Sequence, residues 1–287
     1  MAEPEFGLAA TGAGIEPRLL RAVAEVRATT GDEVSVVRKA KALSKFGFSD
    51  NIDSSGYKTV WEGTAINDEE PLFGDPSVGN VIDTVSSASS GDDQVLSVEG
   101  HTKSGDDLTF VVQTVTLNGQ NEVALSTPLH TCTRAYNTSS TELTGPVYIY
   151  DNADGSSAGV PSDPSDVALY MAGSASTQGQ QSSSGFTAVS SEDYWIVTNV
   201  LADAKRSGTG NFSVVLQTRS TTGVWRPMAV DLSIASTGSS FVHVSLTPAV
   251  IVPKNTYVRV LALSASGVDA SLSAELGGYL AKVMSSS

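Results

Sequence analysis

The stretch of the sequence that most resembles a catalytic motif is Gly-Ser-Ser-Ala-Gly at 155–159, which fits the Gly-x-Ser-x-Gly pattern of a hydrolase nucleophile. In that pattern a strand delivers the serine, here Ser157, to a tight turn that opens a helix. The residues around it are rich in Ser, Gly and Asp, and no helix pattern follows them. Because short patterns recur by chance in such sequence, we interpret the stretch as a loop and not as a catalytic site.

Side chains that could bind a metal are present but scattered. Three histidines fall in separate candidate strands, without the close spacing of a zinc site: His101, His130 and His243. The pair Asp92-Asp93 and the loop with Asp151 and Asp154 could line calcium sites, but "DNADG" lacks the alternating acidic positions of a calcium loop. We therefore predict solvated acidic loops, no catalytic residue, no metal site, no cofactor and no enzymatic activity.

The composition favours an all-β protein. Of 287 residues, 40% are apolar, 17% are charged and 26 are glycine, which is typical of β proteins with many turns. Cys132 is the only cysteine, so no internal disulfide can form. The sequence has no apolar run of membrane-spanning length and no charged-then-apolar leader, so we expect no membrane partner and folding in a cytosol.

Charge is distributed unevenly along the chain. The formal net charge is −14; residues 1–45 hold seven basic and six acidic side chains, a net of +1, and the rest carries −15. An acidic body repels phosphate backbones, so we expect no nucleic-acid partner. The basic side chains near the end of the first segment differ from this body and are candidates for partner binding: Arg38, Lys39, Lys41 and Lys45.

From residue 46 onward, strand-like segments alternate with turn residues, which predicts antiparallel sandwiches. The first unit contains six candidates: Asn80–Ser86, Gln94–Gly100, Leu108–Leu117, Glu122–Thr127, Leu129–Tyr136 and Pro146–Tyr150. Asn118-Gly119 predicts a type I′ hairpin between two of them. The apolar phase slips within Leu108–Leu117, which predicts a bulge near 112–114.

A polar, proline-bearing stretch at 151–166 is the expected linker to a second β unit. There, Phe212, Val214 and Leu216 alternate with other residues, which predicts a half-buried strand with these three on its buried face. The apolar run 193–201 predicts a central strand. We predict two antiparallel, jelly-roll-like sandwich domains at 46–160 and 161–287.

Residues 1–45 are expected to form a partly helical arm. Apolar residues recur at helical spacing from Pro17 to Arg27, and Thr30 with Glu33 matches a capping box that could start a second helix through Leu43. The basic residues would decorate that second helix, either as a solvated face or as a docking surface for an acidic neighbour.

Six stretches resemble a family of structural proteins of tailed bacteriophages, especially aquatic ones. They lie at 57–75, 81–125, 133–151, 193–200, 214–234 and 247–262. Within them are the Thr59-Val60-Trp61 opening, the Val-Thr-Leu-Asn-Gly turn, a strand bearing Arg134 and a Gly-Pro-Val-Tyr strand. The likeness covers about residues 46–284 and consists of strands and turns, not of catalytic residues.

The resemblance implies a non-enzymatic virion protein, folded in the host cytoplasm before assembly. Its partners would be other virion subunits, such as the major capsid protein or tail and portal proteins, and copies of itself, with a trimer as one form. We expect capsid decoration or cementing; a tail-associated protein or a glycan-binding adhesin is the alternative. Trp225, beside Arg226, could stack on a glycan or anchor a subunit interface, and we favour the interface.

Overall fold

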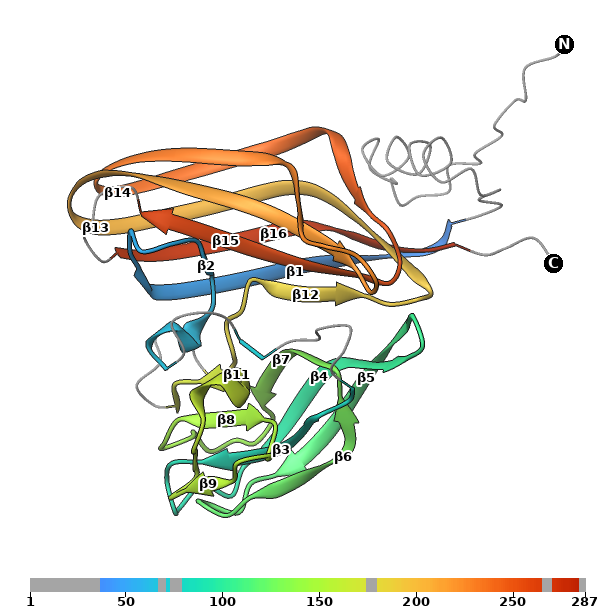
Figure 1. Ribbon diagram of the computed structural model, residues 1–287, viewed down its shortest axis with the longest axis vertical. Helices are drawn as coiled ribbons and strands as arrows, with labels where there is room; N and C mark the ends of the chain where they lie inside the picture. The colour runs from blue at the N-terminus through green and yellow to red at the C-terminus, as the bar shows by residue number, and fades with distance from the viewer. Residues whose placement is uncertain (1–36, 67–70, 73–78, 174–179, 265–269, 284–287) are drawn as a thin grey trace, which may run out of the picture.

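The computed structural model describes residues 37–66, 71–72, 79–173, 180–264 and 270–283 (Figure 1). Regular structure in these ranges consists of sixteen strands and two short 3-10 helices, η1 (Glu62–Ala65) and η2 (Pro164–Asp166). The prediction of an all-β chain with antiparallel sheets is therefore confirmed. Figure 1 shows two bodies stacked on each other, which we call the outer sandwich and the middle module.

The outer sandwich combines strands from both ends of the described chain. Its members are β1 (Val37–Ile52), β2 (Lys58–Thr59), β12 (Phe186–Val189), β13 (Asp193–Ser220), β14 (Arg226–Val252), β15 (Thr256–Ser264) and β16 (Ala270–Val283). They form one antiparallel sheet in the order β1-β16-β13-β15-β12, with β14 also paired to β13 and β2 to β15. The second sandwich unit thus includes strands that precede the first unit in sequence.

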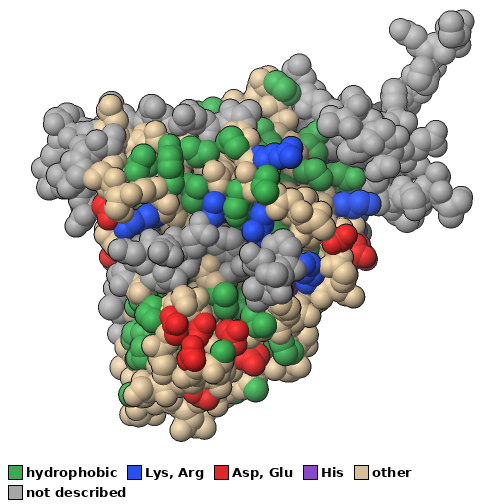
Figure 2. All heavy atoms as spheres, in the orientation of Figure 1, with side chains coloured by type: hydrophobic (Ala, Val, Ile, Leu, Met, Phe, Trp, Pro, Cys, Tyr) green, Lys and Arg blue, Asp and Glu red, His purple; other side chains and the backbone are tan. Residues whose placement is uncertain are grey.

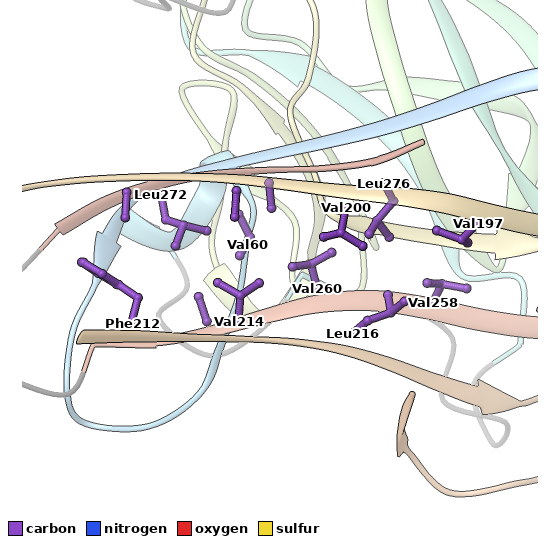
Figure 3. Close-up of a cluster of buried hydrophobic side chains, with 14 of the residues drawn as sticks. Val60, Val197, Val200, Phe212, Val214, Leu216, Val258, Val260, Leu272 and Leu276 are labelled. Atoms are coloured by element: carbon purple, nitrogen blue, oxygen red, sulfur yellow. The ribbon is translucent and has the colours of Figure 1, made fainter. Parts of the chain in front are cut away.

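Two long strands fold this sheet over itself. The first part of β13, Asp193–Lys205, pairs with β16, whereas Phe212–Ser220 pairs with β15, and β14 follows β13 past both. Figure 3 shows the apolar side chains enclosed between the resulting layers. As predicted, Phe212, Val214 and Leu216 point into this core, and the segment 193–201 lies centrally between β14 and β16.

The second helix expected in the arm is wrong. Residues 37–45 belong to β1, which pairs with β16 from Val37↔Val283 to Ile52↔Ala270. The helical spacing of the apolar residues there is outweighed by pairing with a distant strand, and Leu43 and Ile52 pack against the core from an extended chain. The first expected helix lies outside the described residues.

The middle module, residues 79–173, is inserted between β2 and β12. Its strands are β3 (Ile82–Ser87), β4 (Val95–Ser104), β5 (Asp107–Thr116), β6 (Val123–Leu129), β7 (Thr131–Asn137), β8 (Val147–Tyr150), β9 (Ser156–Ser157), β10 (Val160–Pro161) and β11 (Val167–Met171). A four-stranded sheet, β11-β8-β3-β6, faces a three-stranded sheet, β5-β4-β7, across an apolar core. The six strand candidates of the first unit correspond in order to the six observed strands β3 to β8.

Sheet membership divides the chain differently from the expected boundaries at 46 and 161. The expected linker, 151–166, lies within the middle module, where it forms the β9–β10 hairpin and η2. The Ser86 hydroxyl donates to the carbonyl of Gly159 at 2.9 Å, which ties the hairpin to β3. Polar composition predicts a linker poorly here because short side chains pair with backbone groups inside the module.

The expected bulge near 112–114 is also wrong. β4 and β5 pair in continuous register from Val95↔Thr116 to Ser104↔Asp107. Two destinations for the apolar residues explain the phase slip: Val115 and Leu117 face the module core, whereas Phe110 and Val112 stand exposed on the other face. When the two faces of one strand carry apolar residues at different points along its length, the sequence pattern looks like that of a register shift although the pairing is regular.

The Asn118-Gly119 turn differs from the predicted type I′ hairpin. Asn121 N–H donates to the Asn118 carbonyl at 3.1 Å, so Gly119 and Gln120 are the central residues. Only Gly119 of these has positive φ, +58°, which is the pattern of a type II′ turn and not of type I′. The turn links β5 to β6, which belong to different sheets, so it crosses the sandwich instead of closing a hairpin.

Replacing Gly119 tests the fit of this turn. A Cβ at Gly119 would lie 2.5 Å from the carbonyl oxygen of Ser90, whereas Gly105 has the same φ of +58° and open space around it. Gly119→Val should therefore lower the free energy of unfolding by more than about 1 kcal/mol beyond Gly105→Val, because only the former adds a backbone clash to the strain. Denaturant titration of both variants measures this difference, and equal losses would contradict the close approach to Ser90.

Two truncations test the role of β1. Deleting residues 1–45 removes β1 pairing partners from Val37↔Val283 to Lys45↔Leu276, whereas deleting 1–36 leaves β1 complete. We expect the longer deletion to lower the free energy of unfolding by more than about 2 kcal/mol relative to the shorter one, because it exposes core side chains and the β16 edge. Equal thermal and denaturant stability of the two truncations would contradict the assignment of β1 to the outer sandwich.

Candidate functional site

The predicted partner-binding residues do not form one surface. Four of them lie on β1: Arg38, Lys39, Lys41 and Lys45. Trp225 directly precedes β14, and Arg226 is the first residue of that strand. In the order of the sheet, β16 and β13 separate β1 from β14. Lys41 and Arg226 are exposed. Because these residues lie on two different edge strands of one sheet, they form two separate candidate partner-binding sites.

Lys45 reaches from β1 into the middle module. Its ammonium group donates a hydrogen bond to the backbone carbonyl of Thr133 in β7. Burial lowers the pKa of Lys45 to about 8, and the nearby Glu99 carboxylate opposes that shift. Because its ammonium group is engaged in this contact, Lys45 is not available to bind another molecule. It links the two bodies of this chain instead.

His101 and Cys132 lie in the same buried environment. Burial lowers the pKa of His101 to about 3, with the positive charge of Lys45 adding to the effect, and its Nδ1 lies 3.3 Å from the Thr131 hydroxyl. Burial likewise raises the pKa of the Cys132 thiol to about 12. A neutral imidazole and a protonated thiol are a structural pair at neutral pH, because nucleophilic cysteines need a depressed pKa.

A second contact between the bodies is aromatic. Leu108 of β5 packs with Phe186, Ala188 and Tyr257 of the outer sandwich. A hydrogen bond also links the two bodies here, because the backbone N–H of Leu108 donates to Oδ1 of the Asn255 side chain at 3.0 Å. Burying such side chains contributes roughly 1.5 to 3 kcal/mol each.

The Tyr257 hydroxyl completes this contact with His130. His130 Nε2 lies 2.8 Å from the hydroxyl, and Nδ1 lies 3.0 Å from the Gly79 carbonyl. Since a carbonyl only accepts, Nδ1 carries the proton and Nε2 accepts from Tyr257. The histidine that sequence analysis left without a role is a connector between the two bodies.

Trp61 forms the third contact. It follows β2 of the outer sandwich and is buried against Tyr148, Tyr150 and Val167, which belong to β8 and β11 of the middle module. Its neighbour Glu62 donates a backbone hydrogen bond to Ser183 at 2.9 Å. With three anchors of different chemistry, the two bodies meet through a buried junction.

Trp225 is half-buried beside this junction and packs against the cluster around Tyr257. The Arg259 guanidinium lies 4.1 Å from its ring centroid and that of Arg219 lies 4.9 Å away. Arg259 is itself held by Gln217, whose Oε1 accepts from Nε at 3.0 Å and from Nη2 at 2.9 Å. Guanidinium groups thus occupy ring surface that a stacking sugar would need.

Sequence reasoning missed the partners of Trp225. Arg219 and Arg259 come from β13 and β15, which pair with each other, so the arrangement depends on register between distant segments. The one available signal was alternation in 256–264, where Tyr257 and Arg259 fall on the same face of a strand. That signal indicates a shared face but cannot identify what covers it.

The serine motif at 155–159 has no elbow geometry. Ser157 is exposed in the two-residue strand β9, which turns directly into β10, not into a helix. The neighbouring Ser156 hydroxyl donates to Glu122 at 2.7 Å. The interpretation of this stretch as a loop agrees with its backbone, and the absence of enzymatic activity stays a prediction.

An acidic cluster lies close to this hairpin. Asp154, Asp163 and Asp166 each offer a carboxylate oxygen within 4.8 Å of the others. Burial, and then repulsion from Asp163, Asp151 and Asp154, raises the pKa of Asp166 to about 6. Sequence analysis pointed to Asp151 and Asp154 but missed Asp163 and Asp166. Carboxylates of this spacing could accept a cation, although such clusters are common on acidic proteins without one, and solvated acidic loops stay our interpretation.

Neutralising Asp166 tests this repulsion. Because its folded-state pKa lies above 3.8, the folded chain gains a proton that the unfolded chain lacks between about pH 4 and 6, so stability falls as pH rises through about 6. Asp166→Asn should raise the melting temperature near pH 7 and have little effect near pH 3. The matched change Asp93→Asn, at an exposed loop residue, should raise it less. A lower melting temperature for Asp166→Asn at pH 7 would contradict the repulsion.

The fold and the junction define a class: an all-β protein of two antiparallel sandwiches, one inserted into the other. No protein-family model and no curated protein matches the chain. Among solved structures, it is similar to the infectious bursal disease virus Gt strain, with 10% identity over 86% of this chain and 73% of that one and a TM-score of 0.22.

Two other structures of the same virus give similar values. The VP2 subviral particle matches with 11% identity over 91% of this chain and 77% of the other, at a TM-score of 0.22. The derived T=1 particle matches with 10% identity, 92% and 75% coverage, and a TM-score of 0.23. At these scores the likeness carries no argument about fold or function. Among the described residues, no helix is long and apolar enough to cross a membrane.

Proposed function

We propose that the chain is a non-enzymatic structural protein of a tailed-bacteriophage virion, with capsid decoration or cementing as its role. The sequence resemblance at 57–75, 81–125 and the four later stretches supports the virion assignment. The arrangement of ionisable groups supports a structural role, since Lys45 and His130 link the two bodies, whereas His101 and Cys132 are buried near Lys45 within the middle module. Each of these residue types can serve catalysis elsewhere, but here their partners are structural.

The observation that carries the proposal is the division of charge between the two bodies. Residues 79–173 hold two basic and twelve acidic side chains, a net of −10, whereas 37–66 together with 180–283 hold twelve basic and nine acidic ones, a net of +3. Figure 2 shows the acidic side chains gathered on the middle module in this view. Such a molecule has one end suited to contact and one end that repels its own copies.

This uneven distribution of charge suggests how the chain would be oriented on a capsid. The outer sandwich would face the shell and neighbouring subunits, and the acidic middle module would point outward, where mutual repulsion keeps particles dispersed. Stabilisation would come from burial at many repeated contacts, with standard interfaces of about 1,600 Å² each adding to the total. This orientation replaces an N-terminal helical arm as the expected anchor, since β1 belongs to the outer sandwich.

Labelling and reconstitution test the proposal. Gold-labelled antibody against this chain should mark the heads of intact particles, and adding purified chain to particles that lack it should raise the temperature at which they release their genome. Binding should weaken with salt, because charge contributes to docking. Labelling of tails would reject the decoration role and support the tail-associated alternative. Absence of the chain from purified particles would overturn the virion assignment.

A further inference from the structure

β14 forms a long sheet edge. It spans 27 residues and, within the described chain, pairs only with β13. Along an antiparallel strand the backbone N–H and C=O groups point alternately to the two sides, so half of those in β14 point away from β13. The run Ser239–Ser245 pairs with β13 in unbroken register, which makes it a regular template roughly 24 Å long.

This edge lacks the usual protection against pairing. Exposed edges in natural proteins carry charges, prolines or bulges. Residues 232–253 contain no Asp, Glu, Lys or Arg, in a chain whose net charge is −14. Register shifts next to Ser239 and Ser245, with Pro248 beyond, limit the two ends of the run but leave its middle regular. The opposite edge strand, β1, is protected in the ordinary way, because Arg38, Lys39 and Lys41 lie on it.

The side chains of this run are unusually open to solvent. Phe241 is 64% exposed. Val242 and Leu246 point to the other face and pack against the core of the outer sandwich but remain only partly buried. A strand added along β14 would cover Phe241 and complete the burial of Val242 and Leu246. We call residues 239–246 the β14 edge.

The net charge around each exposed apolar segment indicates whether a second copy of the chain can bind there. A second exposed apolar pair, Phe110 and Val112 on β5, lies on the middle module, whose net charge of −10 opposes the approach of another copy. The β14 edge belongs instead to the outer sandwich, with a net of +3, and itself contains no Asp, Glu, Lys or Arg. Two copies that meet there avoid charge repulsion at the contact, and their acidic modules need not face each other.

We propose that two copies of this chain associate through their β14 edges, as antiparallel strands related by a two-fold axis. An isologous contact uses the same surface on both copies, so one edge without Asp, Glu, Lys or Arg meets an identical one. The pairing would supply backbone hydrogen bonds along the run and bury Phe241 of both copies. The inference does not depend on the virion assignment, because it concerns the isolated chain in solution.

Sedimentation equilibrium of the full chain measures the association. Wild type should form dimers at micromolar concentration. The double change Phe241→Asp with Ser245→Asp should raise the dimer dissociation constant more than about tenfold, because it places like charges at the contact. Both residues are exposed, so circular dichroism and the melting temperature should stay near wild type. Val112→Asp, at an exposed valine on β5, is the matched control and should leave the dissociation constant unchanged.

Cross-linking places the contact directly. Ser245→Cys with a short bismaleimide should yield covalent dimers, whereas Val112→Cys should not. The native Cys132 is buried, so the introduced thiol is the reactive one. A monomeric wild type at high micromolar concentration would overturn the proposal. So would dimers that resist the double aspartate change, or dimers in which only position 112 cross-links, which would assign the interface to β5.

Discussion

The pairing of β1 with β16 is the constraint on which the rest of the structure depends. It joins segments more than 200 residues apart, and the side chain of Ser44 adds a hydrogen bond to Glu275 of the facing strand. By holding β1 in place, this pairing also directs Lys45 toward Thr133 and brings the chain through Ile52 to Trp61. Two of the three anchors of the junction therefore follow from one strand pairing.

In the junction, the unfavourable free energy of burying polar and charged groups is offset by apolar burial and by hydrogen bonds. Burying an ammonium group is unfavourable, and the lowered pKa of Lys45 expresses that cost. Burial of Leu108, Phe186 and Tyr257 a short distance away supplies apolar stabilisation, and the hydrogen bond between His130 and Tyr257 leaves neither polar group unsatisfied. Polar anchors of this kind fix one relative orientation, which apolar contacts alone would specify less sharply.

Local patterns in the sequence predicted the strands of the middle module because alternation and turn residues determine them over short distances. Phe212, Val214 and Leu216 were predicted to be buried for the same reason. The segment 37–45 was predicted to be part of a helix because its apolar residues satisfy helical spacing, and only its pairing with β16 near residue 280 makes it a strand. Insertion of one module into another, and the guanidinium groups around Trp225, likewise depend on pairings between distant segments that no local pattern records.

The inserted topology imposes an order of events during protein synthesis. All strands of the middle module lie between residues 82 and 171, so its core can close while the ribosome is still translating the second half of the chain. β1 emerges earlier but has to wait for β16, at 270–283, before its hydrogen bonds can form. Contacts of such sequence separation form slowly, so the nascent chain carries an open strand for most of its elongation. That strand carries Arg38, Lys39, Lys41 and Lys45, and charged side chains of this kind disfavour wrong pairing of an open strand.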